Sequence, residues 1–315
     1  MGLAENITKG DVKSAARLIS LIEDGDRDGY YQLSLLLPHT DSAHVIGVTG
    51  PAGAGKSTLT GALASTFSQQ GKKVGVVATD PTSIQGGAFL GDRIRMREAE
   101  GSDVFIRSMA DRGHPGGMAR AVTGAVYVLE ALGKDAILVE TVGAGQSEKE
   151  LFHLCDTIIV LFTRDYGDEI QLLKAGLMEI GDIVVVNKGD LPGTEDAQRE
   201  LSACASKRTG TEGWLTPVLV TRADRGVGVA EVMEAVQRHR QFITEDGRRD
   251  GRRKEKIVAL TRSLLKEEAW ERLCGAIADD KECSKIAEDV GNMKIDPYSA
   301  VEKIMEKVAF GIKAG

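Results

Sequence analysis

Residues 50–57 read Gly50-Pro51-Ala52-Gly53-Ala54-Gly55-Lys56-Ser57, which matches the pattern G-x-x-x-x-G-K-[ST]. An apolar run that ends at Val48 precedes this stretch, and a helix-like segment from Thr58 to Gln70 follows it. In this strand–loop–helix context the backbone N–H groups of the loop and the helix N-terminus attract phosphate oxygens. We therefore interpret residues 50–58 as a phosphate-binding loop (P-loop), in which Lys56 reaches the β- and γ-phosphates and Ser57 ligates Mg²⁺. A glycine-rich turn with an incidental lysine is the alternative, and it leaves the flanking pattern unexplained.

The composition is that of a globular protein. The chain has 315 residues, of which 42% are hydrophobic and 28% are charged, and its net charge is -7. This acidic balance argues against nucleic acid or an anionic membrane as the main partner. No apolar run approaches the ~20 residues that span a bilayer, and the first eleven residues do not have the pattern of a secretory signal. The four cysteines (Cys155, Cys204, Cys274 and Cys283) lack metal-site spacing and predict a reduced, cytoplasmic protein.

Strand-like and helix-like segments alternate over the middle of the chain. The strand candidates are 44–49, 73–79, 103–107, 135–140, 157–163, 182–187 and 216–221, and the clearest helix candidates between them are 117–132 and 227–240. This alternation predicts an α/β P-loop NTPase fold, with a mainly parallel sheet covered by helices on both faces. We expect a helical extension at 1–43, the nucleotide-binding domain at 44–245 and a helical arm at 246–315. In the extension, the run Leu35-Leu36-Leu37 is expected to pack into a core, with a partner site as the alternative.

A guanine-reading motif follows the sixth strand candidate, where residues 187–190 read Asn187-Lys188-Gly189-Asp190. The Asp190 carboxylate can accept hydrogen bonds from the ring N–H and the exocyclic amine of guanine, which adenine does not offer as a pair. A site built for such bonds discriminates strongly against analogues that lack them. Asn187 is expected to brace the loop and Lys188 to cover the base. A simple Asx-type turn after a strand is the alternative.

Acidic residues at two other strand ends complete the expected site. Glu140-Thr141-Val142-Gly143 closes one strand, and the expected roles are an acid near Mg²⁺ for Glu140 and an N–H donor to the γ-phosphate for Gly143. Asp80 follows another strand and is expected to join Ser57 and Glu140 around Mg²⁺, although Asp80-Pro81 is also a common turn former. The next position, Ala144, has no group to orient water, and Gln146 is the remaining candidate. Intrinsic hydrolysis is therefore expected to be slow.

Together these motifs resemble the MeaB/ArgK-type GTPases over roughly residues 10–240. The matching stretches also include residues 86–96, 112–117, 140–148 (Glu-Thr-Val-Gly-Ala-Gly-Gln-Ser-Glu) and 167–171. The resemblance implies a GTP-hydrolysing chaperone that binds GTP or GDP with Mg²⁺. It also implies a role in gating adenosylcobalamin delivery to a cobalamin-dependent acyl-CoA mutase, such as methylmalonyl-CoA mutase, and in protecting that mutase. A homodimer formed through the C-terminal arm is a further implication.

One further segment extends the resemblance, and two short stretches depart from it. The segment 163–175 resembles a family switch that relays the nucleotide state to the partner, and Lys174 is its candidate relay residue. The first departure is Thr163-Arg164-Asp165-Tyr166 at the start of the same segment. The base-contact loop, Thr221-Arg222-Ala223, departs from the Ser-Gly or Ser-Ala of the family, so its guanine affinity is open.

Two other functions compete with the chaperone interpretation. A nickel-delivery GTPase would need Cys/His clusters, for which His153 and Cys155 are the nearest candidates. A kinase would transfer phosphate to a small molecule or a transport protein. A guanine-reading motif together with a switch-like glutamate loop is more typical of a GTPase whose hydrolysis times a conformational switch.

Overall fold

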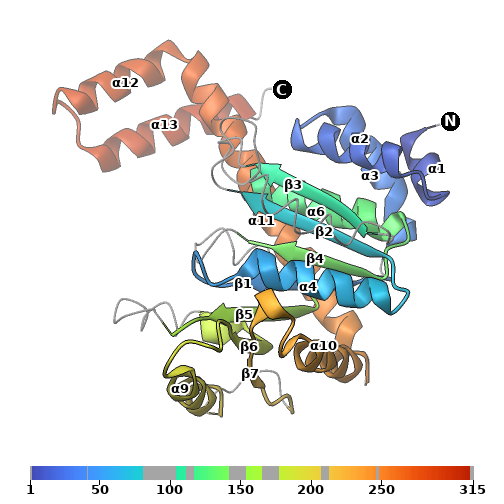
Figure 1. Cartoon of the computed structure of the whole chain (residues 1–315). Helices are drawn as coiled ribbons and strands as arrows, with labels where there is room; N and C mark the ends of the chain where they lie inside the picture. Colours follow the sequence, from blue (N-terminus) through green and yellow to red (C-terminus); the bar gives the residue numbers. More distant parts are fainter. Residues whose placement is uncertain are drawn as a thin grey trace. The chain divides into compact units, whose positions relative to one another are not determined.

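One parallel sheet forms the centre of the computed structural model, which describes residues 2–40, 42–80, 104–110, 117–141, 154–164, 177–206, 213–245 and 248–312. In the described part the sheet has seven strands in the order β3-β2-β4-β1-β5-β6-β7 (Figure 1). Their bounds are β1 (His44–Thr49), β2 (Val74–Asp80), β3 (Val104–Ala110), β4 (Ala136–Glu140), β5 (Thr157–Phe162), β6 (Ile183–Val186) and β7 (Val218–Val220). Each lies within or close to its predicted range, which confirms the predicted parallel α/β architecture.

The register of the strands separates two buried faces. Val45 pairs with Ile137 and Ile46 pairs with Leu138, so neighbouring residues of each strand point to opposite sides. Val45 and Ile137 belong to a core that includes α6 (Gly117–Ala131), whereas Ile46 and Leu138 belong to a core under α4 (Lys56–Gln69) and α10 (Val229–Thr244). A third cluster joins β5 and β6 to α9 (Thr194–Ser206). Helices therefore cover both faces of the sheet, as predicted.

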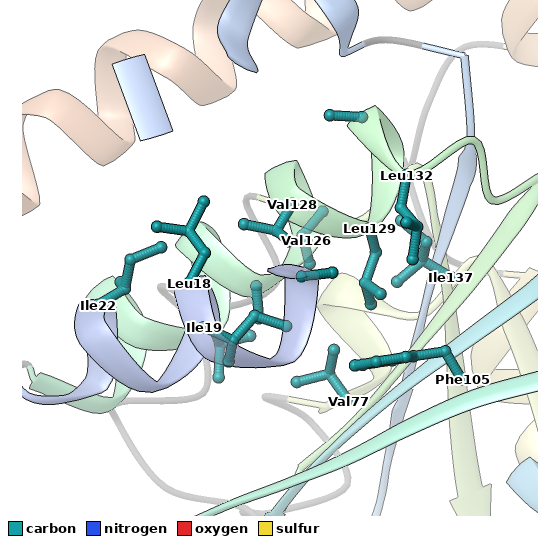
Figure 2. Packing of buried hydrophobic residues seen from close by; sticks show 14 of the residues in the cluster. Leu18, Ile19, Ile22, Val77, Phe105, Val126, Val128, Leu129, Leu132 and Ile137 are labelled. Atoms are coloured by element: carbon teal, nitrogen blue, oxygen red, sulfur yellow. The ribbon is translucent and has the colours of Figure 1, made fainter. Parts of the chain in front are cut away.

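The N-terminal helices share the first of these cores. They are α1 (Leu3–Thr8), α2 (Val12–Glu23), α3 (Arg27–Leu36) and the short 3₁₀ helix η1 (Leu37–His39). Leu18, Ile19 and Ile22 of α2 point toward α6 and the sheet, where Val77 and Leu129 lie (Figure 2). These contacts make the N-terminal helices part of the packed domain.

Polar contacts fix α2 and α3 in addition. Asp11 and Asp26 accept hydrogen bonds from the first backbone N–H groups of α2 and α3. Arg107 of β3 pairs with Glu23 and donates a 2.9 Å hydrogen bond to Ser20 Oγ.

The expectation for the leucine run at the end of α3 is wrong for two of its three residues. Leu36 is fully buried, but Leu35 and Leu37 are 47% and 50% exposed. Three consecutive helical residues point in directions about 100° apart, so a core on one side of the helix takes only one of them.

The chain divides into two compact units, Met1–Val258 and Ala259–Gly315. Helix α11 (Arg248–Asp279) crosses this boundary, and α12 (Lys281–Gly291) and α13 (Pro297–Ile312) follow it. Among the described side chains of the second unit, Cys283 and Ala300 are buried, and Lys307 Nζ lies 3.5 Å from Asp280 Oδ1. Among the described helices, none combines the length and the apolar composition that a membrane span requires.

Candidate functional site

The P-loop connects the end of β1 to the first residue of α4, at the carboxyl edge of the sheet (Figure 1). Gly50 has a φ of 146°, and a Cβ atom there would lie 2.3 Å from the carbonyl oxygen of Leu161 in β5. Gly55 caps α4 with a φ of 93°, and a Cβ atom there would lie 2.2 Å from Nδ2 of Asn187. Side chains at these two positions would therefore push the loop away from β5 and from the guanine motif.

Lys56 holds a positive charge inside this loop. Its Nζ donates hydrogen bonds to the carbonyl oxygens of Gly50 (2.9 Å) and Pro51 (3.0 Å), and the residue is only 7% exposed. The ammonium group thus lies against the backbone of the predicted phosphate site. A buried cation beside the N-terminus of a helix is the arrangement that favours a polyphosphate.

Two hard oxygen donors meet next to the P-loop. Ser57 Oγ donates a 2.5 Å hydrogen bond to Glu140 Oε1, because Glu140 ends β4 and pairs with Val48 of the neighbouring β1. Hydroxyl and carboxylate oxygens are ligands that Mg²⁺ prefers, and the Ser57 oxygen keeps lone pairs while it donates to Glu140. The side chains therefore fit the predicted magnesium role.

Asp80 is the third predicted magnesium ligand. It is the last residue of β2, whose Ala78 pairs with Glu140. The backbone of Asp80 therefore lies at the same edge of the sheet as Glu140, and its side chain is outside the described residues. Thr79 Oγ1 donates a 3.0 Å hydrogen bond to the carbonyl oxygen of Glu140, which ties the two strand ends together.

Asn187 joins three loops through its side-chain amide. Its Nδ2 donates to the carbonyl oxygen of Ala54 in the P-loop at 2.9 Å. Its Oδ1 accepts from Thr221 Oγ1 at 2.9 Å and from the backbone N–H of Ala223 at 3.1 Å. The predicted phosphate loop, guanine motif and base-contact loop are thus connected by a single residue that is 4% exposed.

The other residues of the guanine motif are more exposed to solvent. Lys188 is exposed and has a φ of 59°, which turns the chain sharply after β6. The Asp190 side chain is 52% exposed, and its Oδ1 lies 3.6 Å from Nε of Arg222. The sequence indicated neither the Arg222–Asp190 contact nor its geometry. The nucleotide roles of all these residues stay predictions.

Several predicted residues lie outside the described part of the chain: Gly143, Ala144, Gln146, His153 and Lys174. Cys155, the other candidate for nickel, is 3% exposed and belongs to the apolar core shared with α6. Among the described residues, no group of three or more His, Cys, Asp or Glu side chains could hold a metal ion.

Comparisons with known proteins identify the family of this chain. Residues 15–278 match the family model described as "Methylmalonyl Co-A mutase-associated GTPase MeaB". A Pyrococcus horikoshii protein whose name assigns it provisionally to the GTPases is 40% identical, over 97% of each chain. The "Methylmalonic aciduria type A homolog, mitochondrial" of Caenorhabditis elegans is 30% identical, over 94% of this chain and 74% of its own.

A solved structure is similar along nearly the whole length. The crystal structure of a LAO/AO transport system kinase has a TM-score of 0.73 and 25% sequence identity, and the match covers 98% of this chain and 96% of that one. The chain therefore belongs to the MeaB family of methylmalonyl-CoA mutase-associated GTPases and is itself a P-loop GTPase.

Proposed function

We propose that this GTPase is a chaperone of an adenosylcobalamin-dependent acyl-CoA mutase, with methylmalonyl-CoA mutase as the first candidate. In this role GTP binding and hydrolysis gate the delivery of adenosylcobalamin to the mutase and protect the mutase from inactivation. The observation that carries the proposal is the match of residues 15–278 to a family named for its association with methylmalonyl-CoA mutase. We place this activity in the cytoplasm.

The nucleotide is held at the carboxyl edge of the sheet. The backbone of residues 50–58 and the Lys56 ammonium bind the phosphates, and Asn187 keeps this loop next to the base site through its bond to Ala54. Asp190 accepts the hydrogen bonds that distinguish guanine from adenine, while Lys188 covers the base. Thr221, Arg222 and Ala223 line the same site.

Magnesium is the cofactor that we assign to Ser57, Glu140 and Asp80. When bound, Mg²⁺ neutralises the charge that develops between the β- and γ-phosphates. The support is the 2.5 Å hydrogen bond from Ser57 to Glu140, which holds a hydroxyl and a carboxylate beside the P-loop. Glu140 orients the Ser57 hydroxyl in this arrangement.

Hydrolysis is slow without the partner because Ala144 offers no group that orients water. Gln146 or a residue of the mutase supplies this function, and Gly143 donates its N–H to the γ-phosphate. Lys174 relays the nucleotide state from the switch segment 163–175 to the mutase.

In this proposal residues 246–315 act as a dimerisation arm, residues 44–245 form the GTPase domain and residues 1–43 form an N-terminal helical extension. Large apolar side chains of the arm are exposed, among them Leu265 (66%), Trp270 (55%), Tyr298 (85%) and Val301 (59%). A second copy of the chain would remove such surface from water. Size-exclusion chromatography with light scattering measures the mass, and a monomer at micromolar concentration contradicts the dimer.

The test of the chaperone role is GTP turnover with and without the purified cognate methylmalonyl-CoA mutase. We expect a slow basal rate that rises several-fold when the mutase is added. The variant Lys174→Ala should keep the GDP affinity of the wild type and lose most of this stimulation, while the control Lys72→Ala, at an exposed lysine beyond α4, should keep it. An unstimulated wild type contradicts the chaperone role. Transfer of labelled γ-phosphate to an acceptor instead of water favours the kinase alternative.

A further inference from the structure

Arg222 is fixed beside the guanine motif by its own backbone. It follows Thr221 in the loop after β7, and its N–H donates to the carbonyl oxygen of Val227 at 2.9 Å. The N–H of Val227 donates back to Arg222 at 3.2 Å, which closes a tight loop. A Cβ atom added to Gly189 would lie 3.7 Å from Arg222 Cγ, so the stem of the arginine passes next to Gly189.

This path brings the start of the guanidinium to Asp190. Nε of Arg222 lies 3.6 Å from Asp190 Oδ1, just beyond hydrogen-bond distance. The Nε atom is buried, and it has no hydrogen-bond partner in the described part of the chain. The Arg222 and Asp190 side chains are 40% and 52% exposed, so both can adjust. A buried N–H without an acceptor is unfavourable, and a small movement toward Oδ1 would satisfy it.

We propose that Arg222 is a positioning residue for guanine selectivity, which acts by holding the Asp190 carboxylate in the orientation that reads the base. This inference rests on the proposed reading of guanine by Asp190. An ionised carboxylate offers about four lone-pair directions, so Oδ1 can accept from Arg222 while the carboxylate also accepts from the two donors of guanine. A carboxylate that is already oriented loses less conformational freedom when the nucleotide binds.

The same loop offers a matched control. Arg225 Nε lies 3.6 Å from Asp224 Oδ2, the same distance as in the Arg222–Asp190 pair, but those side chains are 71% and 64% exposed. Arg225→Gln therefore removes the same charge three residues away without touching Asp190. A general effect of positive charge on the nucleotide phosphates should appear in both variants, whereas positioning of Asp190 should appear only in Arg222→Gln.

The experiment measures GDP and ADP dissociation constants by calorimetry for the full-length wild type, Arg222→Gln, Arg225→Gln, Asp190→Ala and the double variant Asp190→Ala/Arg222→Gln. We expect Arg222→Gln to weaken GDP about 3- to 5-fold, as suits a half-exposed ion pair, and to leave ADP unchanged. In the Asp190→Ala background the same substitution should change GDP affinity less than about 2-fold, because the carboxylate through which it acts is gone. Melting temperatures check that each variant is folded.

The positioning role would be overturned by an equal loss of GDP and ADP affinity in Arg222→Gln, or by an equal loss of GDP affinity with and without Asp190. A gain of GDP affinity also contradicts it, since it shows that the arginine competes with the base. If the wild type itself binds GDP and ADP equally, the proposed guanine site as a whole is wrong. If the wild type prefers GDP and Arg222→Gln leaves this preference unchanged, only the positioning role of Arg222 is wrong.

Discussion

The two edges of the central sheet both carry polar side chains at strand ends, but they use them differently. At the carboxyl edge Asn187 connects three loops, and Asp190 and Arg222 beside it are 52% and 40% exposed. At the amino edge His44 Nε2 lies 2.8 Å from Thr157 Oγ1, which in turn lies 2.8 Å from His239 Nδ1.

Every residue of this hydrogen-bonded group at the amino edge is buried. His44, Thr157 and His239 are 3%, 0% and 0% exposed, and Asp182, 3.3 Å from the other nitrogen of His239, is 6% exposed. The indole N–H of Trp214 closes the cluster with a 2.9 Å bond to the carbonyl oxygen of Asp182. Polar groups that bond one another inside the protein stabilise the fold, whereas half-exposed groups on loops can change partners when a ligand arrives. Substitutions at the two edges should therefore have separable effects.

The largest effect is expected for Lys56→Ala at the carboxyl edge. Removal of the ammonium takes away charge stabilisation at the β- and γ-phosphates, so GTP turnover should fall at least ~100-fold. Turnover is measured by phosphate release, with Lys72→Ala as the control. Turnover that stays within a few-fold of the wild type contradicts the assignment of Lys56.

Asn187→Ala should affect both binding and stability. The substitution leaves the Ala54 carbonyl, the Thr221 hydroxyl and the Ala223 N–H without the partner that they share, at a cost of about 3 kcal/mol in the free energy of unfolding. GDP affinity should fall at least about 10-fold, because the P-loop and the guanine motif lose their connection. Urea unfolding and calorimetry measure the two quantities. An unfolding free energy like that of the wild type contradicts the structural half of this prediction.

Thr157→Val should lower the stability of the fold and leave nucleotide binding unchanged. The hydroxyl between His44 and His239 is lost, so the unfolding free energy should fall by about 2 kcal/mol while the GDP dissociation constant stays within 2-fold. Thr244→Val, at the exposed end of α10, is the matched control. If GDP binding weakens together with stability, the two edges are coupled and the comparison between them is wrong.

The smallest expected effect is on the pH dependence of the free energy of unfolding, to which two buried groups at the amino edge contribute with opposite signs. Burial lowers the pKa of His44 to about 3 from 6.5, so its contribution to stability is complete above pH 6.5 and is lost as the pH falls. Burial, aided by the charge of Asp156, raises the pKa of Glu130 to about 7 from 4.5, so its contribution grows as the pH falls from 7 to 4.5. Each term is worth about 1 to 2 kcal/mol between pH 7 and pH 5.

Single variants separate these two terms. From pH 7 to pH 5, Glu130→Gln should lose more unfolding free energy than the wild type, and His44→Gln should gain relative to the wild type. Chemical denaturation at both pH values measures the differences. Identical pH slopes in all three proteins would show that neither group changes its protonation on unfolding.

The sequence predicted the central strands β1, β4, β5 and β6 because they are buried almost throughout and therefore appear as nearly continuous apolar runs, whereas β3 and β7 at the ends of the sheet are only partly buried. It did not predict α9, whose buried apolar side chains are Leu201 and Ala205, nor α12, which buries Cys283. Leu201 is the one large aliphatic residue of α9, so this helix leaves a weak periodic signal, whereas the apolar residues of α12 (Cys283, Ile286 and Val290) do recur at helical spacing.

The motifs of the site were visible because each is local in sequence, but the contacts between them were not. His44 and Thr157 lie 113 positions apart, and Thr157 and His239 lie 82 apart. Arg222 was noted only as a departure from a familiar loop, because its pairing with Asp190 depends on how two loops approach each other. Sequence patterns report the chemistry of a segment, whereas such pairings follow from the packing of distant strands.

The most direct test of the guanine site is the ratio of ADP to GDP dissociation constants in the wild type and in Asp190→Ala. We expect the wild type to bind GDP at least ~100-fold more tightly than ADP, because two hydrogen bonds to a carboxylate are worth a few kcal/mol. Asp190→Ala should remove most of this preference by weakening GDP alone, and Asp190→Asn should shift the preference toward xanthine nucleotides. Equal dissociation constants for GDP and ADP in the wild type would contradict the account.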